Sequence, residues 1–160
     1  MKMNLVLREL HRSEESLLHD LLAVSDRHKV EHEIHHVARD VAAWSRRHVH
    51  DLAVAGREFG LRLDDDPPAR SGPLAPLRAM LSEFTGRRPE PGLLLLADLR
   101  RLHLGAAGVS LDWELLAQGA QATKNTGLLE LAQRCHPETL RQLKWTNAML
   151  KTLSPQVLAS

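Results

Sequence analysis

The amino-acid sequence predicts an all-α protein, an antiparallel four-helix bundle with a long proline-rich crossover between its second and third helices. Three observations predict this fold. Apolar residues recur every three or four positions in both halves of the chain, the spacing that lines one stripe of a helix. Six of the eight prolines lie in residues 60–92, between the two halves. β-Branched residues are too sparse, and their alternation too weak, to predict any strand.

The first half of the chain is expected to form two helices, at about residues 4–24 and 27–59. Ser25 and Asp26 are favourable N-cap residues, and they separate two apolar stripes, so a tight turn is expected there. The stripes consist of Leu7, Leu10, Leu17, Leu21 and Val24, then of Val30, Ile34, Val37, Val41, Trp44, Leu52, Ala55 and Phe59.

The second half repeats this plan, with helices expected at about residues 93–122 and 127–153 and a turn at residues 124–127. Pro137 is expected to kink the last helix, because proline removes a backbone donor and crowds the preceding turn. The small residues from Gly105 to Gly108 leave the third helix slender, so a neighbouring helix can approach closely. The stripes here are Leu95, Leu99, Leu102, Ala106, Val109, Trp113, Leu116 and Ala120, then Leu129, Ala132, Thr139, Leu143, Thr146, Leu150 and Leu153.

A chain of 160 residues is most simply one domain, and residues 1–160 are expected to form a single helical bundle. The crossover at residues 60–92 has apolar spacing for a short helix at residues 74–84 that would cap the bundle. The alternative is a pair of helical hairpins that meet only on dimerisation.

The composition excludes several classes of function. The formal net charge is +1, so the chain has no strong field to attract nucleic acid or an anionic membrane. The N-terminus lacks the apolar stretch of a signal peptide, and the longest purely apolar run, Leu93 to Ala97, is too short to span a bilayer. The single cysteine, Cys135, excludes an internal disulfide and cysteine-based zinc sites and favours a reducing, cytoplasmic setting.

Residues 28–40, HKVEHEIHHVARD, contain four of the ten histidines and suggest a metal site. On a helix, however, His28, His32 and His35 face away from the apolar stripe. Because they are spaced by four and three residues, they are neighbours on an exposed face and are candidates for a surface chelate of zinc, nickel or copper. The alternative is a solvated, weakly basic face with no ligand.

Three polar residues fall on or near the inward stripes: Glu14, His48 and His136. A buried carboxylate needs a partner, which a histidine or a metal ion would supply. One interpretation is a hydrogen-bonded network that fixes the register of the helices, and the other is an interior site for a single metal ion. The expected helix limits put Glu14 about 10 Å or more above the two histidines, too far for one ion.

The chain resembles the ferritin-like superfamily, particularly its small bacterial members. The resemblance is carried by Glu14 and Glu15, by HVHDLAVAGREFG at the end of the second helix, by the crossover, and by LLELAQRCHPETLRQLKWTNAMLK in the fourth helix. It implies iron binding and ferroxidase or oxygenase chemistry. The chain departs from the family pattern because the fourth helix has no E-x-x-H and the stripe of the third helix has no inward carboxylate.

These observations predict a non-catalytic, ferritin-like bundle with a degenerate metal site and a structural or partner-binding role. It is expected to form a homo-oligomer, a dimer or larger, and to have a protein partner rather than nucleic acid or a membrane. The alternative is a protein that binds iron or zinc and stores it, senses it or oxidises a substrate. A third hypothesis is pH sensing through the ten histidines.

Overall fold

The structure is a computed structural model that describes residues 2–66 and 90–160. The described part contains four α-helices and no strand, which confirms the all-α prediction. The helices are α1 (Lys2–Arg27), α2 (His32–Arg57), α4 (Pro91–Ala122) and α5 (Thr126–Leu158). None of these helices is long and apolar enough to cross a membrane. The short helix expected at residues 74–84 lies outside the described residues.

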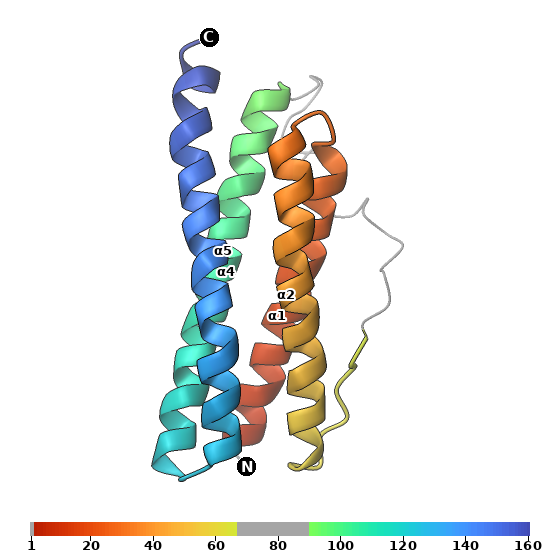
Figure 1. Ribbon diagram of the computed structural model, residues 1–160, viewed down its shortest axis with the longest axis vertical. Helices are drawn as coiled ribbons and strands as arrows, with labels where there is room; N and C mark the ends of the chain where they lie inside the picture. Colours follow the sequence, from red (N-terminus) through yellow and green to blue (C-terminus); the bar gives the residue numbers. More distant parts are fainter. Residues whose placement is uncertain (1, 67–89) are drawn as a thin grey trace.

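The four helices lie side by side along their length (Figure 1). α1 packs against α2 and α4, and α5 packs against α4 and, less extensively, α2. α1 and α2 run in opposite directions, as do α4 and α5 (Figure 1). The C-terminal end of α2 and the N-terminal end of α4 lie at opposite ends of the molecule (Figure 1).

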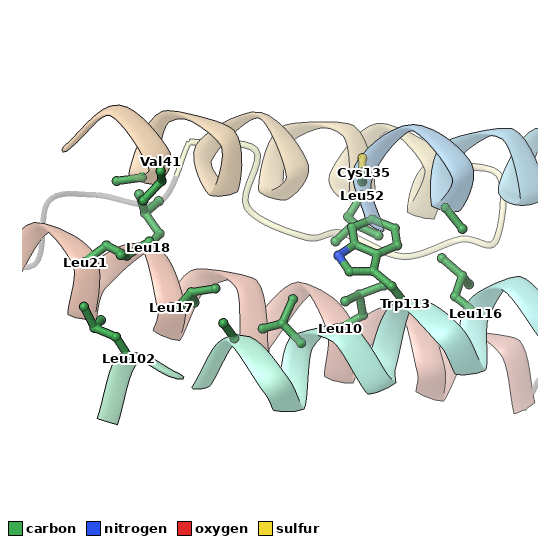
Figure 2. Packing of buried hydrophobic residues seen from close by; sticks show 14 of the residues in the cluster. Leu10, Leu17, Leu18, Leu21, Val41, Leu52, Leu102, Trp113, Leu116 and Cys135 are labelled. Atoms are coloured by element: carbon green, nitrogen blue, oxygen red, sulfur yellow. The ribbon is translucent and has the colours of Figure 1, made fainter. Parts of the chain in front are cut away.

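The apolar stripes of the four helices meet in one buried cluster. Trp113 of α4 is its largest fully buried side chain. Figure 2 shows this indole extending from α4 into the interior, near Leu10 of α1, Leu52 of α2 and Cys135 of α5. Cys135 is a buried free thiol in this interior. One interior therefore receives side chains from all four helices.

The turn between α1 and α2 differs from the one expected at Ser25 and Asp26. Helix α1 continues to Arg27, and α2 begins only at His32. Ser25 is not a cap, because its hydroxyl donates to the backbone oxygen of His35 at 2.7 Å, and His35 Nδ1 donates to the Ser25 backbone oxygen at 2.8 Å. These contacts tie the last turns of α1 to the first turn of α2. The boundary therefore lies several residues later than the cap preference of Ser25 suggested.

The other helix ends lie close to the predicted ones. Helix α4 begins at Pro91, and Asn125 caps α5 by accepting a hydrogen bond from the backbone N–H of Leu128 at 3.0 Å. Helix α5 continues through Pro137 and, beyond its expected end, through Pro155 to Leu158. Neither proline therefore ends the helix.

Candidate functional site

The centre of the interior is a contact between Glu14 of α1 and His48 of α2. Both side chains are buried, with 0% and 1% of the residue surface exposed. His48 Nδ1 donates to Glu14 Oε1 at 2.8 Å, and the Trp113 indole N–H donates to the same oxygen, also at 2.8 Å. The sequence-based expectation that Glu14 and His48 point inward is therefore confirmed, and three helices meet at this carboxylate.

The expected separation of about 10 Å between Glu14 and the histidines is wrong for His48. Because α1 ends at Arg27 and α2 begins at His32, Glu14 lies 13 residues before the turn and His48 lies 16 residues after it. The two residues therefore differ in level by about three residues, or roughly 5 Å along the helix axes. Their side chains span that difference.

The second ring nitrogen of His48 also faces a carboxylate. His48 Nε2 lies 3.1 Å from Glu138 Oε1 on α5, and Arg47 donates to the other oxygen, Oε2, at 3.0 Å. The charged groups of Glu14, His48, Glu138 and Arg47 thus form a line of alternating sign from the core to the surface. We call these four residues the interior charge network.

The surroundings of His48 favour the protonated form of its ring. Burial by itself lowers the pKa of His48, but the interactions with Cys135 and Glu14 outweigh it and raise the pKa to about 10. A protonated imidazole has two N–H donors, and each nitrogen of this ring has a carboxylate oxygen in range. The Trp113 ring lies edge-on to the imidazole, with 5.7 Å between the ring centroids. At neutral pH the ring is an imidazolium whose donors are both used.

The arrangement does not fit a metal centre. A histidine binds a metal ion through a nitrogen lone pair, but both ring nitrogens of His48 face carboxylate oxygens within hydrogen-bond distance. The inward side chain of α4 at this level is Trp113, which donates a hydrogen bond where a metal site would need a ligand. Among the polar atoms of Glu14, His48 and Trp113, the Glu14 Oε2 oxygen has no hydrogen-bond partner within the described part of the chain. Across residues 2–66 and 90–160, no group of three or more His, Cys, Asp or Glu side chains is placed to hold a metal ion.

His136, the third predicted interior residue, belongs to a different contact. Its Nε2 is hydrogen-bonded to Ser110 Oγ at 2.8 Å, and its Nδ1 lies 3.8 Å from Glu114 Oε2, on the partly exposed edge between α4 and α5. The partner that α5 supplies to His48 is instead Glu138. The structure brings Glu14 and His48 together and places His136 with other residues.

The prediction that His28, His32 and His35 share an exposed face is wrong. His28 lies in the turn before α2 and is buried, because its Nε2 donates to Asp98 Oδ2 at 2.7 Å. His35 is partly buried against Ser25. Only His32 of the three is exposed, and its ring stacks on that of His36, with 6.4 Å between the ring centroids. The three imidazoles therefore do not form a surface chelate.

Asp98 of α4 is the centre of a second buried polar cluster, so the expectation that the third helix has no inward carboxylate is wrong. Its side chain is fully buried, and Arg27 binds both of its oxygens at 3.1 Å, while His28 binds Oδ2. This cluster joins the end of α1 and the turn after it to the first third of α4. The signal was present in the sequence, because Leu95, Asp98 and Leu102 are spaced by three and four residues on one helix face.

Further buried polar side chains join other pairs of elements. Gln142 of α5 donates to the Val41 backbone oxygen and to Ser45 Oγ of α2, both at 2.9 Å. His11 of α1 donates to the backbone oxygen of Asp64, beyond α2, at 2.7 Å. Thr146 of α5 is hydrogen-bonded to His103 of α4 at 2.9 Å, so each of the four helix pairs in contact is joined by a buried polar side chain.

Comparisons of the chain with protein-family models, with curated proteins and with solved structures found no match. The chemistry of this protein therefore has to be inferred from its own residues. The geometry supports ion pairing and hydrogen bonding between helices, with both nitrogens of the central histidine already bound.

Proposed function

We propose that this protein is a ferritin-like four-helix bundle with a non-catalytic, structural or partner-binding role and a degenerate metal site. Two features support the ferritin-like architecture: the helices pack lengthwise as two antiparallel pairs, and α2 ends at the opposite end of the molecule from the start of α4 (Figure 1). The interior position that a metal site would use holds the Glu14–His48 ion pair instead.

The observation that carries this proposal is the binding of both His48 nitrogens by carboxylates. A di-metal centre in a helical bundle needs inward carboxylates and histidines with free coordinating atoms on facing helices. Here the histidine neutralises the buried Glu14 carboxylate, which is the task that the metal ion performs in such centres. The protein's own side chains thereby occupy Glu14 Oε1 and both ring nitrogens of His48.

Buried ion pairs of this kind contribute specificity more than net stability, because desolvation offsets much of the attraction between the charges. Sliding α2 by one turn, about 5.4 Å, would separate His48 from Glu14 and leave both charges buried without a partner. The same argument holds for Asp98 with Arg27 and His28. We infer that the two clusters fix the register of the helices, so that the bundle presents a constant outer surface. The outer surface is the part of the protein that binds a partner in this proposal.

The same proposal includes self-association and a cytoplasmic location. Cys135 is a buried free thiol, which fits a reducing compartment. Several leucines outside the core are exposed on α4 and supply apolar surface for this self-association.

The direct test is a metal analysis. The protein, purified without a histidine tag, is incubated with Fe²⁺ or Zn²⁺, dialysed, and measured by inductively coupled plasma mass spectrometry. The proposal predicts far less than one metal ion per chain, with no difference between the wild type and the Glu14→Ala variant. A full equivalent of metal that is lost in Glu14→Ala while helicity is kept would overturn it and identify a metal-binding protein.

A further inference from the structure

Helix α4 has a second stripe that faces away from the core. It steps by four and three residues over more than three heptads, the spacing of a coiled-coil seam. Every member of this outer stripe is exposed. The outer stripe consists of Ala97, Arg101, Leu104, Gly108, Leu111, Leu115, Gln118 and Ala122.

The three central leucines of the outer stripe are well exposed, with 54% of the surface accessible for Leu104, 66% for Leu111 and 60% for Leu115. A helix in the wall of a bundle normally has one apolar stripe and a polar opposite face. Contiguous exposed apolar surface on a soluble protein marks an interaction site far more often than chance. A groove of about 540 Å³ between α4 and α1 is lined by Leu115 of the outer stripe and by Leu5 of α1.

Gly108 is the second unusual feature of the outer stripe. A Cβ atom added there would meet nothing within 4 Å, and the residue is not in the left-handed region of backbone conformation. The fold of one chain therefore does not require glycine at this position. A glycine inside a helix costs about 0.5–1 kcal/mol relative to alanine. Because glycine has no side chain, the surface of α4 has a shallow hole at this position, beside Leu104 and Leu111.

The outer stripe is complementary to itself when one copy is reversed. A two-fold axis midway between Val109 and Ser110 places Leu104 opposite Leu115 of the second copy and Gly108 opposite Leu111. The same axis places Ala97 opposite Ala122, and Arg101 opposite Gln118. Each large side chain thus meets an apolar side chain or a hole, and the arginine meets a neutral amide.

We propose that the outer stripe of α4 is a homodimer interface in which α4 packs antiparallel against α4 of a second copy. This inference rests on the proposed function, because it names the partner of the surface that the bundle presents. Leu111 of each copy fills the hole over Gly108 of the other, as a knob fills a hole in a coiled coil.

A parallel arrangement is disfavoured by the same residues. It would place Arg101 beside its own copy and Gly108 beside Gly108, so that like charges would meet and two holes would face each other. The antiparallel arrangement avoids both. The outer stripe is also long enough for a stable contact, since its 26 residues extend over roughly 38 Å. Leu5 of α1, 63% exposed, adds apolar surface at the flank of each copy.

The oligomeric state and the direction of pairing are tested together by disulfide trapping. The double variant Leu104→Cys/Leu115→Cys places the two thiols about 16 Å apart within one helix, too far for an internal disulfide but opposite each other across the two-fold axis. The proposal predicts a covalent dimer after mild oxidation of the double variant and none with Leu104→Cys alone. A covalent dimer formed by Leu104→Cys alone would overturn the antiparallel arrangement. The native Cys135 is buried and serves as the internal control.

The second test is sedimentation equilibrium of the protein without oxidation. We expect a dimer for the wild type, a monomer of unchanged helicity for Leu111→Glu, and a dimer for Leu140→Glu, a matched change at an exposed leucine of α5. A monomeric wild type, or a Leu111→Glu variant that remains dimeric, would overturn the interface. Metal analysis of the same samples separates this failure from a failure of the proposed function, because a monomer without metal contradicts only the dimer.

Discussion

Glu14 on α1 and His48 on α2 form a buried ion pair, with 2.8 Å between Glu14 Oε1 and His48 Nδ1. The residues are 34 positions apart in the chain, and the indole of Trp113 from α4 completes the site. The pair determines how three helices stand relative to one another. It also gives the buried carboxylate of Glu14 a partner of opposite charge.

Removing the carboxylate of Glu14 should lower the stability of the folded protein. The Glu14→Ala variant leaves His48 and the Trp113 N–H facing an apolar gap, so its free energy of unfolding should fall by about 3–5 kcal/mol. Urea unfolding followed by circular dichroism measures this. Glu15→Ala is the matched control, because Glu15 is partly exposed and only 3.5 Å from His11, and it should cost less than about 1 kcal/mol. Equal losses in the two variants would contradict the account.

Stability should decrease as the pH rises. The pKa of His48 is about 10 in the folded state and about 6.5 without its partners, so its contribution is fully present below pH 6.5 and is lost as the pH rises toward 10. Within that window the free energy of unfolding should fall by about 1.4 kcal/mol per pH unit from this group alone. Urea unfolding at a series of pH values should show this slope in the wild type and in His32→Gln, and lose it in His48→Gln. A slope that persists in His48→Gln would refute the assignment.

The Asp98 cluster should hold the turn between α1 and α2 closed. In Asp98→Asn the charge that binds Arg27 and His28 is removed, and the free energy of unfolding should fall by about 3 kcal/mol. Amide hydrogen exchange should quicken most in residues 25–35. Asp112→Asn is the control, because Asp112 accepts a single bond from Ser13 at 2.7 Å and lies partly exposed. It should cost about 1 kcal/mol and leave exchange in the turn unchanged.

Trp113 and Trp145 should respond differently to the loss of the indole N–H. Trp113→Phe removes a donor to the buried Glu14 and should cost about 1–3 kcal/mol in the free energy of unfolding. The Trp145 N–H is buried with no partner in the described part of the chain, so Trp145→Phe should cost less. Thermal unfolding of the two variants compares them directly, and a larger loss for Trp145→Phe would be inconsistent with the proposed hydrogen bonds.

The helices and the two central residues were predictable because they follow from periodicity. Glu14 lies between Leu10 and Leu17, and His48 lies between Trp44 and Leu52, so each occupies a position whose neighbours are buried. The spacing within one helix decides which side chains point inward, and that much needs no knowledge of the other helices. The outward-facing acidic and basic residues follow the same rule.

Periodicity did not predict which side chain on another helix each buried side chain contacts. The predicted turn at Ser25 was misplaced because Ser25 makes its hydrogen bonds to His35, and this shifted the expected level of His48 relative to Glu14. His28 was assigned to the surface of α2 because the turn that removes it from that helix was placed too early. Glu138 lies three residues after Cys135, at the edge of the inward face of α5, and only the packing of α2 beside it makes it the second partner of His48.

The most direct test of the central claim is the protonation state of His48, measured from the ¹⁵N chemical shifts of the histidine rings as a function of pH, with His48→Gln to assign the signal. We expect both nitrogens of His48 to carry protons at pH 7 and to lose one only near pH 10. A His48 signal with one unprotonated nitrogen at pH 7 would show a free lone pair in the core. That result would contradict the ion pair and reopen the interior to a metal ion.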